Sequence, residues 1–170
     1  MDKGGGNTSP CCIVAGNAAC LHDDLKKAGD YPIIAVNGAA REVKAIALFS
    51  QHPERFISLR WIHWQKKFGH EFTVNSVGSG DLPYIDHWWD IPLGGGSAWL
   101  ARKFAVSIGF DRIILCGCPM EPGPYVGNHN LGGFMHRKEV VDDLFQQIKS
   151  DTQWHEGCTS MSGATKRLLG

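Results

Sequence analysis

Small and polar residues follow several short apolar runs of this chain, and their spacing suggests a binding edge. They are Gly16, Asn17, Asn37, Gly38, Gly117 and Ser162. In an open parallel sheet, ligands bind outside the carboxyl ends of the strands. Glycine allows a phosphate to approach backbone N–H groups closely. We therefore predict that these residues hold a nucleotide or another phosphorylated small molecule on free strand-end amides. The alternative is that the glycines only make tight turns.

Gly96 and Ser97 form a second candidate anion site, because they end a glycine run directly before a predicted helix over 98–108. The first N–H groups of a helix have no partner within the helix and attract anions. A flexible joint followed by a serine N-cap is the alternative. The chain has neither a Walker-type phosphate loop nor a full Gly-x-Gly-x-x-Gly after its first apolar run. This argues against P-loop phosphoryl transfer and an ordinary NAD-binding fold.

Two histidines, His129 and His136, lie in or just after a stretch rich in proline and glycine over 119–133. Long loops in compact domains tend to be functional, and histidine acts as a general base near neutral pH. We therefore treat both as candidate catalytic residues, with Arg137 and Lys138 as candidates for neutralising a phosphate. The plainer interpretation is that the histidines are surface or capping residues.

Tryptophan and cysteine offer further candidate chemistry, but a structural interpretation is favoured for each. Trp88 or Trp89 could stack on a base or sugar, although core packing is the favoured interpretation. The six cysteines include no Cys-x-x-Cys pair, so we expect buried, reduced thiols rather than a zinc site. Asp86 and Asp90 match no metal motif or acid–base pair, and no metal site is predicted.

Short apolar runs alternate with helix-period segments, which is typical of a parallel sheet wrapped by helices. The predicted strands cover residues 11–15, 32–36, 56–59, 72–74 and 112–116. The predicted helices cover residues 21–28, 40–49, 61–68, 98–108 and 138–149, with a short one from 164. In the helix over 98–108, Arg102 and Lys103 are expected opposite an apolar stripe that includes Ile108. The predicted fold is a single-domain, Rossmann-like α/β domain over 11–170, with a mostly parallel sheet flanked by helices and a flexible lead-in over 1–10.

Composition narrows the function classes. The chain has 170 residues, with 17 Lys+Arg against 17 Asp+Glu, so its formal net charge is zero. A neutral chain lacks the usual footprint of a nucleic-acid or membrane-surface binder, although Arg60, Lys66 and Lys67 could form a local basic patch. No apolar run reaches the roughly 18 residues of a membrane span, and the first residues lack the apolar core of a signal peptide. We expect a cytoplasmic protein whose partner is a small-molecule nucleotide. The sequence is compatible with a homo-oligomer and with a monomer.

Three separate stretches also carry a family resemblance. Residues 96–117 resemble a helix–strand unit of the group that contains bacterial CMP-sialic-acid-using sialyltransferases and archaeal 6-hydroxymethylpterin diphosphokinase-like proteins. Residues 14–21 look like the first-strand motif of that group, with Ala18, Ala19 and Cys20 where the motif has Gly, Pro and Ser. Residues 35–38 look like its second-strand end, and short phage-encoded proteins are also similar, including at 160–165.

The resemblance implies a nucleotide pocket and a class of reaction. The pocket would be made by Gly16, Asn17, Asn37, Gly96, Ser97 and Gly117, and a histidine beyond these motifs, His129 or His136, would be the base. The implied protein is a nucleotide- or nucleotide-sugar-binding transferase that moves a glycosyl or a diphosphate group. Its donor would be a CMP-sugar, or ATP with Mg²⁺, and a phage-encoded member would work in the host cytoplasm. The alternative is a non-catalytic nucleotide-binding or phage morphogenesis protein, which the altered first motif and the short chain favour.

Overall fold

The computed structural model describes residues 9–55, 58–126 and 137–170 of the chain. One seven-stranded sheet runs through it in the order β5-β4-β3-β2-β1-β6-β7, and every neighbouring pair is parallel. The strands are β1 (Cys11–Ala15), β2 (Ile33–Val36), β3 (Ala47–Ser50), β4 (Thr73–Val77), β5 (His87–Trp89), β6 (Arg112–Cys116) and β7 (Cys158–Ser160). The strand order reverses between β1 and β6, which is where doubly wound folds bind ligands.

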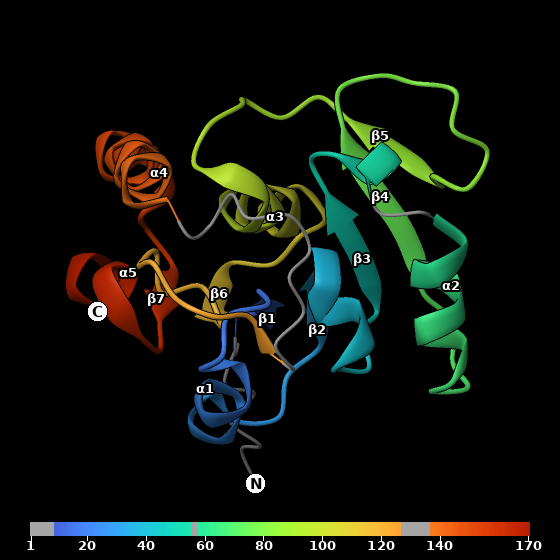
Figure 1. The fold of residues 1–170 in the computed structure, drawn as a ribbon, viewed down its shortest axis with the longest axis horizontal. Coiled ribbons are helices and arrows are strands. Elements are labelled where there is room, and N and C mark those ends of the chain that lie inside the picture. Colours follow the sequence, from blue (N-terminus) through green and yellow to red (C-terminus); the bar gives the residue numbers. More distant parts are fainter. Residues whose placement is uncertain (1–8, 56–57, 127–136) are drawn as a thin grey trace, which may run out of the picture.

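Helices cover both faces of the sheet (Figure 1). They are α1 (Leu21–Ala28), α2 (Ser58–Lys66), α3 (Gly96–Ser107), α4 (Lys138–Ser150) and α5 (Gly163–Leu169), with 3-10 turns η1 (Asn37–Arg41), η2 (Pro53–Arg55) and η5 (Thr152–Trp154). The predicted Rossmann-like α/β fold is therefore confirmed. Within the described residues, no helix has both the length and the apolar character needed to cross a membrane.

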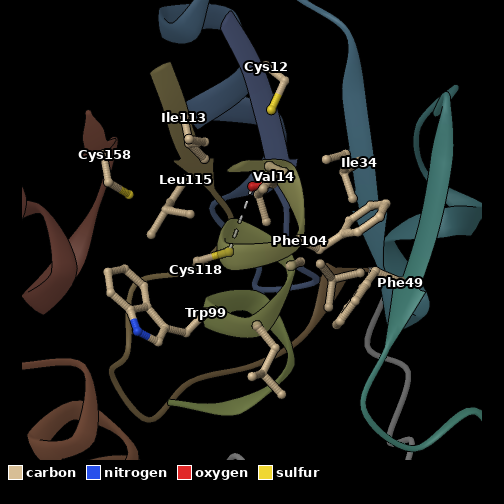
Figure 2. Packing of buried hydrophobic residues seen from close by; sticks show 14 of the residues in the cluster. Cys12, Val14, Ile34, Phe49, Trp99, Phe104, Ile113, Leu115, Cys118 and Cys158 are labelled. Carbon is tan, nitrogen blue, oxygen red and sulfur yellow. Dashed lines mark hydrogen bonds between the residues drawn. The ribbon is translucent and has the colours of Figure 1, made fainter. Parts of the chain in front are cut away.

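Strand alternation divides the core into two clusters. Cys12 and Val14 of β1 face α3, where Trp99 and Phe104 pack against them and their neighbours (Figure 2). Ile13 and Ala15 point to the opposite face and share a cluster with Leu21, Ala39 and Trp61 from α1, η1 and α2. Successive side chains of a strand point to opposite faces, so a central parallel strand must be apolar on both. The run over 11–15 meets that requirement.

Two predicted elements are wrong. The helix expected over 40–49 is a 3-10 turn, η1, followed by strand β3. The spacing of Val43, Ile46 and Ala47 matched a helical period, but Ala47, Leu48 and Phe49 are all buried between β2 and β4. The strand expected over 56–59 fails at Ser58 and Leu59, which begin α2; residues 56–57 lie outside the described residues.

Edge strands and helix ends account for the other differences. β5 and β7 were not predicted, because each has only three residues and no periodic pattern. β1, α1 and β6 have the predicted boundaries, while β2, β4, α2, α3, α4 and α5 differ by one to three residues. Ser97 is not an N-cap: α3 begins at Gly96 after Gly95, which lies in the left-handed region at φ +76°.

The expected solvent face of α3 is buried. Arg102 is 3% and Lys103 is 1% exposed, whereas Ile108, just after the helix, is 37% exposed. Arg102 donates a hydrogen bond to the Glu156 carbonyl over 2.6 Å, and Lys103 Nζ lies 2.6 Å from Asp151 Oδ2. These partners follow α4 in the chain, so a segment some 50 residues away covers what the local pattern marks as an outer face.

Candidate ligand-binding site at the carboxyl edge of the sheet

A cavity of about 1050 Å³ opens at the carboxyl ends of β1, β2, β3 and β6. All eight residues predicted to bind a nucleotide line it, namely Gly16, Asn17, Asn37, Gly38, Gly96, Ser97, Gly117 and Ser162. Residues from five separate parts of the chain therefore meet at one edge of the sheet. Their placement is a finding, whereas their binding of a nucleotide stays a prediction.

Two glycines permit the close approach of chain segments at the point where the strand order reverses. A Cβ atom on Gly16 would lie 2.5 Å from the carbonyl oxygen of Gly117, and a Cβ on Gly117 would lie equally close to that of Gly16. Gly117 also has a φ of +65°. Any side chain at Gly16 would have to push the end of β6 away.

The amides at this point are occupied by the chain itself, so the expectation of free strand-end amides is wrong here. Gly16 N donates to the Cys116 carbonyl over 2.8 Å, and Ala18 N donates to the Gly117 carbonyl over 3.1 Å. Ala19 N donates to the Pro124 carbonyl over 3.0 Å. Gly117 N donates to Asp24 Oδ2 over 2.9 Å. The amides of Ala18 and Ala19 are therefore occupied by the segment after β6, that of Gly16 by β6 itself, and that of Gly117 by α1.

Asn17 and Asn37 both line the same cavity. Both Oδ1 atoms are buried and have no hydrogen-bond partner among the described residues. Buried polar groups are nearly always paired, so each suits a ligand hydroxyl or amino group. Asn37 has a φ of +52° and its carbonyl accepts a 2.9 Å bond from Trp61 Nε1. A Cβ on Gly38 would lie 2.6 Å from Asn17 Nδ2, so glycine there makes room for that side chain.

The N-terminus of α3 forms the opposite wall. Gly96, Ser97 and Ala98 line the cavity in the first turn of a 12-residue helix. Among the described residues, the N-cap position Gly95 makes no side-chain cap, although its own N–H donates to Gln147 Oε1 over 2.8 Å. First-turn amides have no partner within a helix. Ser97 Oγ accepts a 3.4 Å bond from Gln51 N, which ties the wall to the end of β3. The donors of the cavity therefore concentrate on this side.

Several lining residues were missed by the sequence reasoning. They are Gln51, His52 and Arg55 after β3, and Glu121 and Tyr125 in the segment after β6. His52 Nδ1 lies 3.5 Å from Glu54 Oε1. Burial raises the pKa of Tyr125, which keeps its hydroxyl a neutral donor at pH 7. The signal for His52 was its place directly after a strand, but that strand had been predicted as a helix.

The structure does not place the predicted catalytic and phosphate-binding residues at the cavity. His129 and His136 lie outside the described residues. Arg137 and Lys138 are exposed at the start of α4 and are not among the described lining residues, although Val140 and Leu144 of that helix are. Lys138 pairs with Asp142 at 2.5 Å, and this hydrogen bond raises the lysine pKa. A phosphate role for Arg137 and Lys138 has no geometric support here and stays a prediction.

The cysteines and tryptophans follow the structural interpretation. All six cysteines are free thiols, and only Cys20 among them is more than slightly exposed. Burial raises the pKa of Cys12 and of Cys116 to about 12. Trp88 and Trp89 are not among the described lining residues, and Trp89 packs edge-on against Phe104 at 5.1 Å. Within the part of the chain that the structure describes, no cluster of His, Cys, Asp and Glu could hold a metal ion.

The architecture belongs to the class of Rossmann-like α/β folds, and solved structures with the same arrangement are sialyltransferases. The CstII sialyltransferase of Campylobacter jejuni in complex with cytidine-5′-monophosphate matches with a TM-score of 0.63 at 15% identity, over 97% of this chain and 86% of that one. The same enzyme with the substrate analogue CMP-3FNeuAc matches with 0.59 at 12% identity, over 95% and 85%.

A related enzyme extends the likeness. The monofunctional α-2,3-sialyltransferase Cst-I of Campylobacter jejuni matches with a TM-score of 0.54 at 17% identity, over 94% of this chain and 78% of that one. No family model and no curated protein matches the sequence. At these identities the likeness establishes a sialyltransferase-like fold. The diphosphokinase-like and phage-encoded parts of the resemblance stay predictions.

Proposed function

We propose that this protein binds a nucleotide sugar, of the CMP-sugar class, in the cavity at the carboxyl edge and transfers its glycosyl group. One observation carries the proposal: eight residues predicted from the sequence to bind a nucleotide meet around one cavity, in a fold shared with sialyltransferases solved with CMP. Small-molecule sites are concave and carry a few convergent polar groups. The volume of about 1050 Å³ leaves space for a donor and part of an acceptor.

The CMP-sugar would be held both by hydrogen-bond acceptors and by hydrogen-bond donors of the cavity. The unpartnered Oδ1 atoms of Asn17 and Asn37 accept hydrogen bonds from hydroxyl or amino groups of the nucleoside. The first-turn amides of α3 and the neutral hydroxyl of Tyr125 donate to oxygens that gain charge as the glycosyl bond breaks. Donors fixed in advance at such oxygens lower the barrier without reorganisation.

The acceptor hydroxyl needs a base. His129 and His136 keep the role predicted for them. His52 joins them, because it is the histidine that the described residues bring to the cavity, with Glu54 beside its ring. Single His52→Ala and double His129→Ala/His136→Ala variants separate the two assignments. Loss of turnover with retained nucleotide binding identifies the base.

Thermal-shift curves across a nucleotide panel test the proposal. CMP and CMP-sugars should raise the melting temperature by mass action, whereas UMP, GMP and ATP with Mg²⁺ should raise it less. Release of CMP from a CMP-sugar with an acceptor present then measures transfer. Flat curves for every nucleotide and nucleotide sugar would remove the basis for the proposal, and a preference for ATP with Mg²⁺ would favour diphosphate transfer instead.

A second candidate is a nucleotide-binding protein without catalysis. It is favoured by the amides of Gly16, Ala18 and Ala19, which the chain occupies with its own carbonyls. Such a protein would bind CMP and release none from a CMP-sugar. Loss of turnover in the histidine variants would exclude it.

A further inference from the structure

A buried carboxylate stands behind one wall of the cavity. Asp24 of α1 is 1% exposed, and its Oδ2 atom accepts a 2.9 Å bond from Gly117 N and a 2.7 Å bond from Ser162 Oγ. Gly117 follows β6 and Ser162 precedes α5, so one side chain joins three segments that are distant in sequence. No Lys, Arg or His of the described chain forms an ion pair with Asp24.

This carboxylate changes what the wall can bind. It uses the Gly117 amide and the Ser162 hydroxyl, both of which would otherwise face a ligand as donors. The negative charge of Asp24 also acts on the thiols nearby. Burial is the main cause of the raised pKa of Cys116, and the charge of Asp24 is the second. The same charge contributes to the raised pKa of Cys20. A charge of this kind acts strongly because little water screens it.

The wall at the N-terminus of α3 favours anions rather than repelling them. Gly96, Ser97 and Ala98 of the first turn of α3 line the cavity, and the positive end of a helix dipole favours anions. Arg55 lines the same cavity on the side of β3, with its Nε atom 4.0 Å from Glu54 Oε1. A ligand with one anionic and one neutral end therefore meets two unlike walls.

We propose that Asp24 is a positioning residue: it makes the wall formed by α1, β6 and α5 repel anions, so that the anionic group of the ligand lies at the α3 wall and its neutral nucleoside lies against Asn17 and Asn37. This inference rests on the proposed function for the identity of the ligand. The polarity of the wall itself can be measured without any nucleotide.

The first experiment compares CMP with cytidine in titrations of wild type and Asp24→Asn. The amide keeps one acceptor oxygen for Gly117 and Ser162, removes the charge, and places an NH2 group where the second carboxylate oxygen was. CMP should bind Asp24→Asn roughly three- to tenfold more tightly, because a buried charge no longer opposes the phosphate, and cytidine should bind equally well to both. A purely structural Asp24 would weaken both ligands together, and that result overturns the inference.

The second experiment uses the Cys20 thiol as a probe of local charge. Its Sγ atom lies 3.2 Å from Ser162 Oγ, and it is the accessible cysteine of the six. The rate of alkylation by anionic iodoacetate is divided by the rate for neutral iodoacetamide, which cancels any change in the thiol itself. The ratio should rise several-fold in Asp24→Asn. Cys20→Ser confirms the labelled position.

Asp23→Asn is the matched control, because it removes the same charge from an exposed neighbour on the same helix. The ratio should not change in that variant. If Asp24→Asn does not fold, Asp24→Ser, which also removes the charge, is measured in its place. An equal ratio in wild type and the uncharged variant contradicts the inference even if CMP binds. A protein that binds no nucleotide but shows the predicted ratios contradicts only the proposed function.

Discussion

Two buried polar regions of this molecule differ in how completely their groups are paired. Beneath α3, Lys103 Nζ contacts Asp151 Oδ2 at 2.6 Å and donates to the Pro92 carbonyl over 2.9 Å. Asp151 also accepts a 3.0 Å bond from Trp99 Nε1. At the carboxyl edge of the sheet, Asn17 and Asn37 each leave a buried oxygen without a partner among the described residues.

The difference indicates what each region does. A buried charge that is paired and hydrogen-bonded holds elements together, and α3 is tied in this way to the segment after α4. A buried acceptor without a partner lowers stability unless something else satisfies it. We therefore assign the Lys103 region to the fold and the Asn17–Asn37 region to a ligand, and each prediction below tests one side of that division.

The largest effect is expected from Lys103→Ala. Lys103 is 1% exposed and Asp151 is 20% exposed, so the substitution leaves Asp151 without its cation at a partly buried place. We expect a cost at the lower end of the range for a broken buried pair, about 3 kcal/mol. Urea unfolding measures the loss. Lys138→Ala is the control, because it breaks an exposed pair with Asp142 and should have no measurable effect. Equal losses in the two variants would contradict a stabilising role for the buried pair.

Gly16→Ala should have the next largest effect. Its Cβ would lie 2.5 Å from a backbone oxygen of Gly117, so the ends of β1 and β6 must separate. Overpacking of this kind costs about 2 kcal/mol, and nucleotide binding should be lost as well. Gly123→Ala is the matched control, because Gly123 lines the same cavity and no atom of the described residues lies within 4 Å of the added carbon. Wild-type binding by Gly16→Ala would show that the close approach is not needed.

Asn37→Gly should separate stability from binding. Glycine accepts the φ of +52° without strain and removes a buried acceptor that has no partner among the described residues, so the ligand-free protein should lose no stability. Loss of the side-chain acceptor should weaken nucleotide binding about tenfold. Paired urea and calorimetric titrations measure both quantities. A large loss of stability with unchanged affinity would place Asn37 on the structural side of the division.

The smallest effect concerns pH. Burial raises the pKa of Asp151, but hydrogen bonds from Lys103 and Trp99 outweigh it, so the folded pKa lies below its usual value of 3.8. Such a carboxylate stabilises the fold above its unfolded pKa, and this contribution is lost as the pH falls through the folded pKa. Asp151 is 20% exposed, so the loss is modest. Between pH 5 and pH 3, Asp151→Asn should lose less stability than wild type; an equal loss would assign the acid sensitivity to other carboxylates.

The boundaries of β1, β6 and α1 could be predicted because they depend on the local sequence alone. β1 and β6 are apolar runs that end at glycine, and α1 has a clear period, so their boundaries were found. β3 was missed because it is buried on both faces and has no alternation. Arg102 and Lys103 were misplaced because their partners follow α4.

In the candidate site, too, the features that depend on local sequence were predicted and those that depend on distant segments were not. Small and polar residues at strand ends and at the start of α3 were enough to find eight lining residues. The loss of free amides at Gly16 and Gly117 could not be predicted, since these amides donate to Cys116 of β6 and to Asp24 of α1. His52 was hidden by the error over β3. Pairing between distant segments leaves no trace in a single sequence.

A crystal of the protein grown with CMP would show where the nucleotide binds. We expect density for CMP in the cavity, with the nucleoside hydrogen-bonded to Asn17 and Asn37 and the phosphate on the side of Ser97. Nucleotide bound elsewhere on the molecule, or a cavity that stays free of CMP at saturating concentration, would contradict it.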